Sequence, residues 1–312
     1  MDKIRKPFIE QGSIYKKDYF EGWYFKQVNQ NLYKTISFIF GYSTNPQNPH
    51  SFIQIIKTHP LQTTYISYPL ESFQPFEDGY QIQNSFFSPT KLELHIKDET
   101  IQCDGSLSFV DQTELASHNP YMPNIMGPFT YIPNMECNHG VVSMSHIVSG
   151  QLHINDETWI FNQDKGYIEK DWGTSFPKRY IWIQGNHFKN INTSFMMSLA
   201  HIPFLGFSFE GLIAQLNTSN KNYRFATYTG SFRSKIIKNK SGFTLMIKRG
   251  FYRLKVDVIM DDRIDLVSPK NGLMQNTIKE GLGGNIKLSL FHFNQLVLED
   301  TSTNCGIEIE GY

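Results

Sequence analysis

The fold is decided by the stretch Phe20-Glu21-Gly22-Trp23-Tyr24-Phe25-Lys26-Gln27-Val28, which ends at the polar tip Asn29-Gln30-Asn31. A second aromatic-rich run, Tyr33 to Tyr42, follows this tip. Aromatic and β-branched side chains suit the pleated, half-buried surface of a sheet. Two such runs on either side of a short polar tip therefore predict a β-hairpin.

Similar runs, bounded by turn residues, recur along the rest of the chain, and no long window has helical periodicity. The further predicted strands are Phe52–Lys57, Tyr65–Tyr68, Tyr80–Ile82, Leu92–Ile96, Ile101–Phe109, Gly140–Val148, Gly150–Ile154, Thr158–Phe161, Tyr180–Phe188, Ser194–Ala200, Phe209–Leu216, Tyr223–Ser231, Lys235–Lys238, Phe243–Lys248, Tyr252–Met260, Ile286–Phe293 and Leu296–Thr301. Only short helices are expected, one of them near Asp111–Leu115. Many short strands with regular turns are typical of an all-β sandwich or barrel.

The composition supports this fold class and excludes some functions. Aromatic residues make up 14% of the 312 residues, which favours strands, and the length suffices for one large or two medium domains. Lysine plus arginine equals aspartate plus glutamate at 29 each. A neutral chain lacks the positive charge that a nucleic acid backbone attracts, so we expect no nucleic acid partner.

Cysteine usage and the amino terminus indicate a cytoplasmic protein. The three cysteines, Cys103, Cys137 and Cys305, are widely spaced and odd in number, so they predict no disulfide framework. Basic residues near the start are not followed by the apolar run of a secretory signal. The least charged stretch, residues 192–209, is too short and too polar to span a bilayer.

A weak internal similarity indicates two copies of one barrel. Trp23-Tyr24-Phe25 opens a strand that leads to Thr35-Ile36-Ser37-Phe38, and Trp182-Ile183-Gln184 opens one that leads to Ser194-Phe195-Met196-Met197, about half a chain further on. If the similarity reflects a duplication, the seam lies near Asn162–Gly166. The segment Ser117–His139 carries four prolines and few charges, and is expected to cover a barrel mouth.

Four segments resemble the tocopherol cyclase family. They are Tyr19-Phe20-Glu21-Gly22-Trp23-Tyr24-Phe25-Lys26; Gly127-Pro128-Phe129-Thr130-Tyr131-Ile132-Pro133 with Met135-Glu136-Cys137-Asn138-His139-Gly140-Val141; Gly166-Tyr167-Ile168-Glu169-Lys170-Asp171-Trp172-Gly173 with Ser175-Phe176-Pro177 and Tyr180-Ile181-Trp182-Ile183-Gln184-Gly185-Asn186; and Ser268-Pro269, Gly272 and Gly306-Ile307-Glu308. The Asp-Trp-Gly element also looks like that of carotenoid hydratases and lipocalin-type Diels–Alderases. The resemblance implies two lipocalin-like (calycin) antiparallel β-barrels side by side, expected at residues 1–165, with the proline-rich cover, and 166–312.

The resemblance also implies a reaction: acid-catalysed cyclisation or isomerisation of a prenylated or polyene substrate in a barrel cavity, without a cofactor. Such an isomerase or intramolecular lyase would need a carboxylic acid that stays protonated near neutral pH in a water-poor cavity. Burial among apolar groups raises the pKa of a carboxyl group, by up to roughly 3–5 units in the extreme. Aromatic faces can stabilise the resulting cation.

The catalytic candidates are four residues from two of these segments. Asp171 comes first, with Glu169 in the same segment, although a carboxylate that caps a tight turn is the alternative. Glu136 and His139 form a second pair, which would converge as an acid relay only in a turn, because residues three apart in a strand point to opposite faces. The alternative is an ordinary polar turn. Lys170 is expected to be solvated.

Other side chains are candidates for substrate binding. Acids set among aromatic residues would face the lumen or cap a strand, and the tryptophans and the strand histidine would line the cavity or belong to the core. These candidates are Glu21, Trp23, Tyr24, Tyr131, Trp172, Trp182, His187 and Glu210.

Several alternatives remain open at this point. Cys137 and His139 alone do not make a zinc site, so no metal is expected. A non-catalytic, lipocalin-like carrier of a hydrophobic metabolite fits the same barrels equally well. The expected partner is a hydrophobic small molecule, with peripheral membrane contact for ligand exchange as an option.

Overall fold

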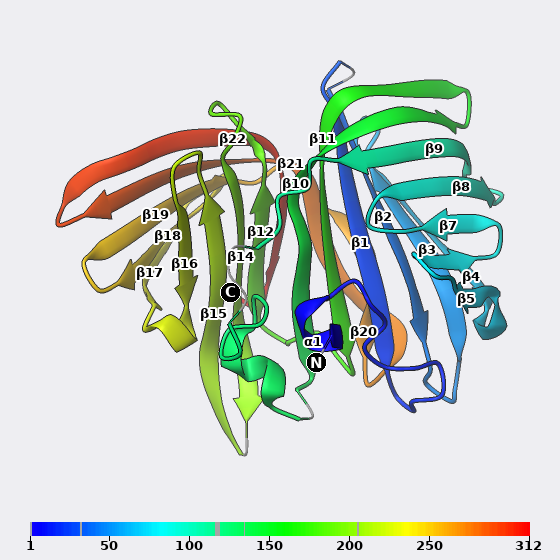
Figure 1. Ribbon diagram of the computed structural model, residues 1–312, viewed down its shortest axis with the longest axis horizontal. Coiled ribbons are helices and arrows are strands. Elements are labelled where there is room, and N and C mark those ends of the chain that lie inside the picture. The colour runs from blue at the N-terminus through cyan, green and yellow to red at the C-terminus, as the bar shows by residue number, and fades with distance from the viewer. Residues whose placement is uncertain (1, 32, 116–118, 134, 205) are drawn as a thin grey trace. The chain divides into compact units, whose positions relative to one another are not determined.

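A computed structural model describes residues 2–31, 33–115, 119–133, 135–204 and 206–312, and within them nearly all regular structure is β (Figure 1). The one α-helix in this part of the chain, α1 (Asp2–Arg5), has four residues. The all-β, lipocalin-like fold class predicted from the sequence is confirmed. No helix in the described ranges has the length and apolar character needed to cross a membrane.

The chain forms two units, each with contributions from two segments. Unit 1 comprises Met1–Phe176 and Leu266–Thr277, and unit 2 comprises Pro177–Asp265 and Ile278–Tyr312. The expected boundary after residue 165 falls within strand β11 (Glu157–Gly173), which belongs to unit 1.

Unit 1 is an antiparallel sheet of eleven strands that is nearly closed into a barrel. Its spatial order is β4-β3-β2-β1-β11-β10-β9-β8-β7-β6-β5. β1, the first of these strands along the chain, therefore pairs with β11, the last of them. The strands are β1 (Phe20–Asn29), β2 (Lys34–Ser43), β3 (His50–Lys57), β4 (Gln62–Pro69), β5 (Phe73–Pro75), β6 (Tyr80–Ile82), β7 (Ser85–Phe87), β8 (Lys91–Lys97), β9 (Gln102–Val110), β10 (Cys137–Ile154) and β11. Short 3₁₀ turns occur at η1 (Leu70–Ser72) and η2 (Gly127–Tyr131).

The two faces of strands β1 to β3 are both buried, but they differ in chemistry. One face packs into an aromatic core around Trp23, whose ring centroid lies 5.0 Å from that of Tyr80 and 5.5 Å from that of Phe87. The other face carries polar side chains such as Tyr24 and Ser37. Because successive strand residues point to opposite faces, one stretch of sequence supplies both surfaces.

Unit 2 is built on a second antiparallel sheet, with the order β16-β15-β14-β12-β22-β21-β19-β18-β17, while β13 pairs with β22 and β20 with β21. The strands of this sheet are β12 (Tyr180–Gly185), β13 (His187–Phe188), β14 (Ser194–Phe204), β15 (Phe207–Asn217), β16 (Asn222–Ala226), β17 (Phe232–Lys238), β18 (Gly242–Arg249), β19 (Tyr252–Ile259), β20 (Ile264–Lys270), β21 (Leu273–His292) and β22 (Gln295–Glu310). Most of β20 and the start of β21 belong to unit 1. A 3₁₀ turn, η3, spans Thr227–Thr229.

The turn between β20 and β21 belongs to unit 1, although it lies far along the chain. Ser43 Oγ donates to the carbonyl oxygen of Gly272 at 2.6 Å, and the amide of Asn45 donates to that of Asn271 at 2.9 Å. These bonds attach a late segment to the loop after β2. The local strand pattern does not predict this attachment, because the contacts join residues more than two hundred positions apart.

Some expectations need correction. Residues 111–115 form no helix, since Asp111, directly after β9, has a positive φ and the residues after it are irregular. Strand β11 is much longer than the predicted Thr158–Phe161, because its second half is buried on both faces and so lacks clean alternation. The proline-bearing segment contains η2 as its one regular turn among the described residues, and its expected start, Ser117, lies outside them.

Candidate active site

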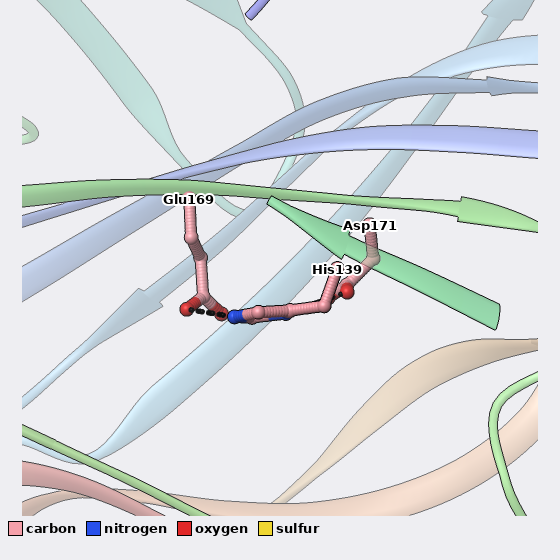
Figure 2. A group of neighbouring side chains, drawn as sticks. All are labelled: His139, Glu169 and Asp171. Atoms are coloured by element: carbon pink, nitrogen blue, oxygen red, sulfur yellow. Dashed lines mark hydrogen bonds and ion pairs between the residues drawn. The ribbon is translucent and has the colours of Figure 1, made fainter. Parts of the chain in front are cut away.

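Strands β10 and β11 bring together three of the four predicted catalytic residues. His139 on β10 pairs with Asp171 on β11, and Val141 pairs with Glu169. Directly opposed residues of an antiparallel pair share a face, as do residues two apart on one strand. His139, Glu169 and Asp171 therefore point the same way, as Figure 2 shows.

The imidazole ring of His139 lies between the two carboxylates. Its Nδ1 is 2.8 Å from Oδ1 of Asp171, and its Nε2 is 3.4 Å from Oε2 of Glu169. The side chains of His139, Glu169 and Asp171 retain 10%, 6% and 24% of their exposure. Asp171 is thus the member of this relay most open to solvent.

These two carboxylates control the charge of His139. Burial alone would lower the pKa of the imidazole, but the negative charges of Glu169 and Asp171 and the hydrogen bond to Asp171 outweigh it and raise the pKa to about 9. The ring is therefore an imidazolium at neutral pH, and both of its nitrogens carry a proton to donate.

Tyr167 extends the relay along β11. Its hydroxyl donates to Oε2 of Glu169 at 2.5 Å, and burial together with the charge of Glu169 raises the pKa of this phenol. Tyr24, a predicted binding residue, pairs directly with Glu169 from β1, and its hydroxyl accepts from Ser37 at 3.0 Å. Sequence reasoning missed Tyr167, although its position two residues before Glu169 was the available signal.

The same three side chains have to be weighed as a metal site. One ligand atom from each lies within 4.8 Å of the others. However, the ring presents Nδ1 to one carboxylate and Nε2 to the other, so it occupies the space between them. One ion cannot bind both nitrogens of a single imidazole, and the arrangement therefore fits a proton relay better than a metal site.

Glu21 and Lys170 form a second buried cluster, on the core face of the sheet. The carboxylate of Glu21 is paired with the ammonium of Lys170, and neither side chain is exposed. Glu21 also accepts from the hydroxyls of Tyr19 at 2.7 Å and Tyr42 at 3.1 Å. The expectation that Lys170 is solvated is therefore wrong, because strand alternation turns it into the core.

The amino-terminal segment closes this second cluster. Backbone amides of Gln11 and Gly12 donate to Glu21 at 2.6 and 2.9 Å, and the ammonium of Lys170 donates to the carbonyl oxygen of Ile9 at 2.6 Å. Lys170 also lies 4.3 Å from the ring centroid of Trp23. Burial lowers the pKa of Lys170 to about 8, although Glu21 opposes the shift. These contacts tie the amino-terminal segment to β1 and β11.

The other candidates in unit 1 lie apart from the relay. Glu136 is exposed just before β10, and its backbone carbonyl accepts from the amide of Thr174 at 2.8 Å. Tyr131 is 54% exposed and donates to the carbonyl oxygen of Pro120. Trp172 is partly buried against the core.

Three further candidates lie in unit 2. Glu210 accepts two hydrogen bonds at 2.8 Å from Arg233, together with one from Tyr312 at 3.0 Å. His187 Nδ1 is 2.9 Å from the amide oxygen of Asn186, and Trp182 is buried. The paired Glu210 has the geometry of a structural ion pair.

A cavity of about 620 Å³ opens in unit 1. Its apolar lining includes Phe8, Phe76, Leu115 and Val141. Val141 lies directly opposite Glu169 in the sheet, but His139, Glu169 and Asp171 are not among the residues that line the cavity. Trp23 is not part of the lining, because aromatic rings of the core surround it.

Comparison with known proteins gives both a family and a fold. A family model described as tocopherol cyclase-like matches residues 71–311. No curated protein matches the sequence. Among solved structures, AttH from Nitrosomonas europaea has 11% identity and a TM-score of 0.56, with 93% of this chain and 92% of that chain covered.

Two further structures have the same fold. CghA, solved with Sch210972, has 8% identity and a TM-score of 0.58, with 94% of this chain and 88% of that chain covered. Kievitone hydratase from Nectria haematococca has 10% identity and a TM-score of 0.53, with 93% and 88% covered. At these identities the likeness concerns the fold alone.

Proposed function

The chain belongs to the tocopherol cyclase-like family, and from this premise we propose that it is an enzyme that cyclises or isomerises a hydrophobic, prenylated or polyene compound. The observation that carries the proposal is the ring of His139, which is hydrogen-bonded to Asp171 through Nδ1 and has Nε2 3.4 Å from Glu169. A carrier needs no such relay, whereas general acid–base catalysis needs a positioned proton donor and acceptor.

The relay supports a catalytic cycle that returns each residue to its starting protonation state. His139 donates its Nε2 proton to a carbon of a double bond, while a hydroxyl of the substrate adds to the neighbouring carbon. Glu169 accepts the proton that this hydroxyl loses, and passes it back to Nε2 across the 3.4 Å between them. One C–O and one C–H bond form, one O–H bond and one π bond break, and no electrons are gained or lost, so the cycle needs no cofactor.

The strength of the acid suggests the kind of substrate. The sequence led us to expect a neutral carboxylic acid, whereas the donor in this relay is an imidazolium with a pKa of about 9. General acid catalysis is most efficient when the pKa of the acid lies near the operating pH. A weak donor suits a conjugated, polarised double bond, as in a polyene or a quinone-derived compound, better than an isolated alkene.

Asp171 and Tyr167 have supporting roles in this proposal. The carboxylate of Asp171 fixes the ring through Nδ1 and stabilises its charged form. Tyr167 donates to Glu169 and thereby orients the oxygen that faces His139. The cavity beside Val141 would hold the apolar part of the substrate.

The test uses prenylated quinols and conjugated polyenes with a free hydroxyl, in deuterated water. We expect an isomer of the substrate with a new ring, in which one carbon-bound hydrogen from the solvent is deuterium. His139→Gln should lower the rate at least about 100-fold, the range typical of a lost general acid. His153→Gln, an exposed histidine of the same strand, is the matched control and should react like the wild type.

Two results would contradict the proposal. One is an unchanged rate for His139→Gln on a substrate that the wild type converts. The other is a hydrophobic compound that co-purifies with the wild type, occupies the protein in native mass spectra and returns unchanged after incubation. The second result would support the carrier.

A further inference from the structure

Three hairpin turns of unit 2 meet at one end of its sheet. Tyr252, after the β18–β19 turn, pairs with His292, before the β21–β22 turn, and their rings stack at 4.4 Å. The amide of Phe293 donates to the carbonyl oxygen of Phe251 at 3.2 Å. Lys221, in the β15–β16 turn, donates to the hydroxyl of Tyr252 at 3.3 Å. The gold and red hairpins end together at the left edge of Figure 1.

These turns expose large apolar side chains. Phe251 and Phe293 stack with their ring centroids 4.2 Å apart, yet remain 68% and 60% exposed. Leu296 and Val297 follow on β22, at 55% and 49%. We call the stacked pair Phe251 and Phe293 the aromatic tip. Two exposed rings in contact mark an interaction site more often than a lone exposed side chain does.

The backbone of the β21–β22 turn is unusual for the residue that it presents. Phe293 and Asn294 both have positive φ, at 48° and 66°. Two-residue hairpin turns of this kind favour glycine, asparagine or aspartate, and a bulky residue there is an outlier. The turn therefore tolerates strain while it holds an aromatic ring in solvent, which points to a use for the ring.

Basic side chains flank the aromatic tip. Lys248 pairs with Arg253 and Arg249 with Tyr252 at the β18–β19 turn, and Lys221 donates to Tyr252. The stretches that carry these residues and the tip, 211–256 and 281–298, contain no acid. The first carboxylates beyond these stretches are already paired: Asp257 with Lys255 at 2.6 Å and Glu299 with Lys287 at 3.0 Å. A surface that complements the tip should therefore be anionic.

From these observations we infer that the aromatic tip docks unit 2 on a membrane that contains anionic lipids. Aromatic residues at a membrane surface lie at the level of the headgroups, and lysines and arginines beside them bind anionic lipid. Projecting turns can enter this layer without a shape-matched partner. The surface is argued independently of the proposed function, but it would place the protein where hydrophobic substrates dissolve.

The experiment is co-sedimentation of the full chain with vesicles of phosphatidylcholine, with or without 30% phosphatidylglycerol. We expect the wild type to bind the anionic vesicles, and 0.5 M salt to weaken this binding, because the Debye length shortens. The double variant Phe251→Ser with Phe293→Ser should bind at least tenfold more weakly. Lys221→Gln and Lys248→Gln should each weaken binding about fivefold.

Matched controls come from other turns of the same unit. Phe207→Ser removes a phenylalanine that is 82% exposed at the start of β15. Lys240→Gln removes an exposed cation in the β17–β18 turn, at the end of β18 that is far from the aromatic tip. Both should bind vesicles like the wild type.

Two outcomes would overturn the inference. One is that the phenylalanines make no difference on anionic vesicles, either because the wild type does not bind or because the double phenylalanine variant binds as tightly as the wild type. The other is a wild-type dimer, detected by light scattering, that this variant converts to a monomer while it still binds vesicles. A second copy of the chain would then be the occupant of the tip.

Discussion

Glu169 and Lys170 are consecutive in the chain, yet their side chains lie on opposite buried faces of β11. Glu169 accepts from Tyr167 and faces His139, whereas Lys170 pairs with Glu21 among the aromatic rings of the core. Strand alternation thus separates an acid–base relay from a structural ion pair by one residue. Substitutions at the two positions should therefore have different consequences.

Removing the ammonium of Lys170 should mainly cost stability. We expect Lys170→Met to lower the free energy of unfolding by about 3–5 kcal/mol, because it leaves the carboxylate of Glu21 buried without its counter-charge. The double variant with Glu21→Gln should recover part of this loss. Urea unfolding measures both values, and Lys97→Met, at an exposed strand position, should stay within about 0.5 kcal/mol of the wild type. A single variant as stable as this control would disprove the structural assignment.

The charge on His139 should make stability fall in mildly alkaline solution. Its pKa is about 9 in the folded chain and near 6.5 in the unfolded chain, so its contribution is complete below about pH 6.5 and is lost as the pH rises to 9. We expect a loss on the order of 2–3 kcal/mol across this window. His139→Gln should flatten this part of the profile, measured by urea unfolding at several pH values. His153→Gln should keep the wild-type slope.

His146, on the same strand, should act in the opposite direction. Burial lowers its pKa to about 3, and its ring contacts the hydroxyl of Ser143 at 3.1 Å and the ring of Phe109. The unfolded chain then binds this proton more readily, so stability falls as the pH drops from about 6.5 toward 3. Imidazole resonances followed by NMR should show His146 neutral at pH 5, where His139 is charged. Protonation of both rings at the same pH would contradict the assignment.

The carboxylate of Asp171 should determine the titration of His139. We expect Asp171→Asn to lower the pKa of His139, because the variant removes one of the two charges that raise it. Glu136→Gln should leave this pKa unchanged, since Glu136 is exposed outside the strand pair and does not contact the ring. NMR titration of the imidazole resonances measures the pKa of His139 in both variants. An equal shift in both would mean that Glu136 acts on His139 after all.

The aromatic side chain of Phe8 should anchor the amino-terminal segment to the barrel. Phe8 contacts the rings of Trp23, Phe25 and Tyr80, and its carbonyl oxygen accepts from the indole of Trp23 at 2.8 Å. Phe8→Ala should therefore lower the free energy of unfolding by about 3–5 kcal/mol, and Phe8→Leu by clearly less. Equal effects of the two substitutions in urea unfolding would argue against this packing role.

The all-β character, the first hairpin and the residue types of the relay follow from the amino-acid sequence alone. Alternation, aromatic content and turn residues are local properties, so they can be read before any strand is paired. His139, Glu169 and Asp171 were all candidates on this basis. Their segments also carried the family resemblance.

Only the tertiary structure decided which candidates meet. The pairing of β10 with β11 joins His139 to residues thirty positions away and leaves Glu136 outside, and the pairing of β1 with β11 brings Glu21 to Lys170. The attachment of the β20–β21 turn to unit 1 likewise depends on distant segments. A shift of one residue in register would exchange the two faces of β11, and register is set by the packing of the whole sheet rather than by any local pattern.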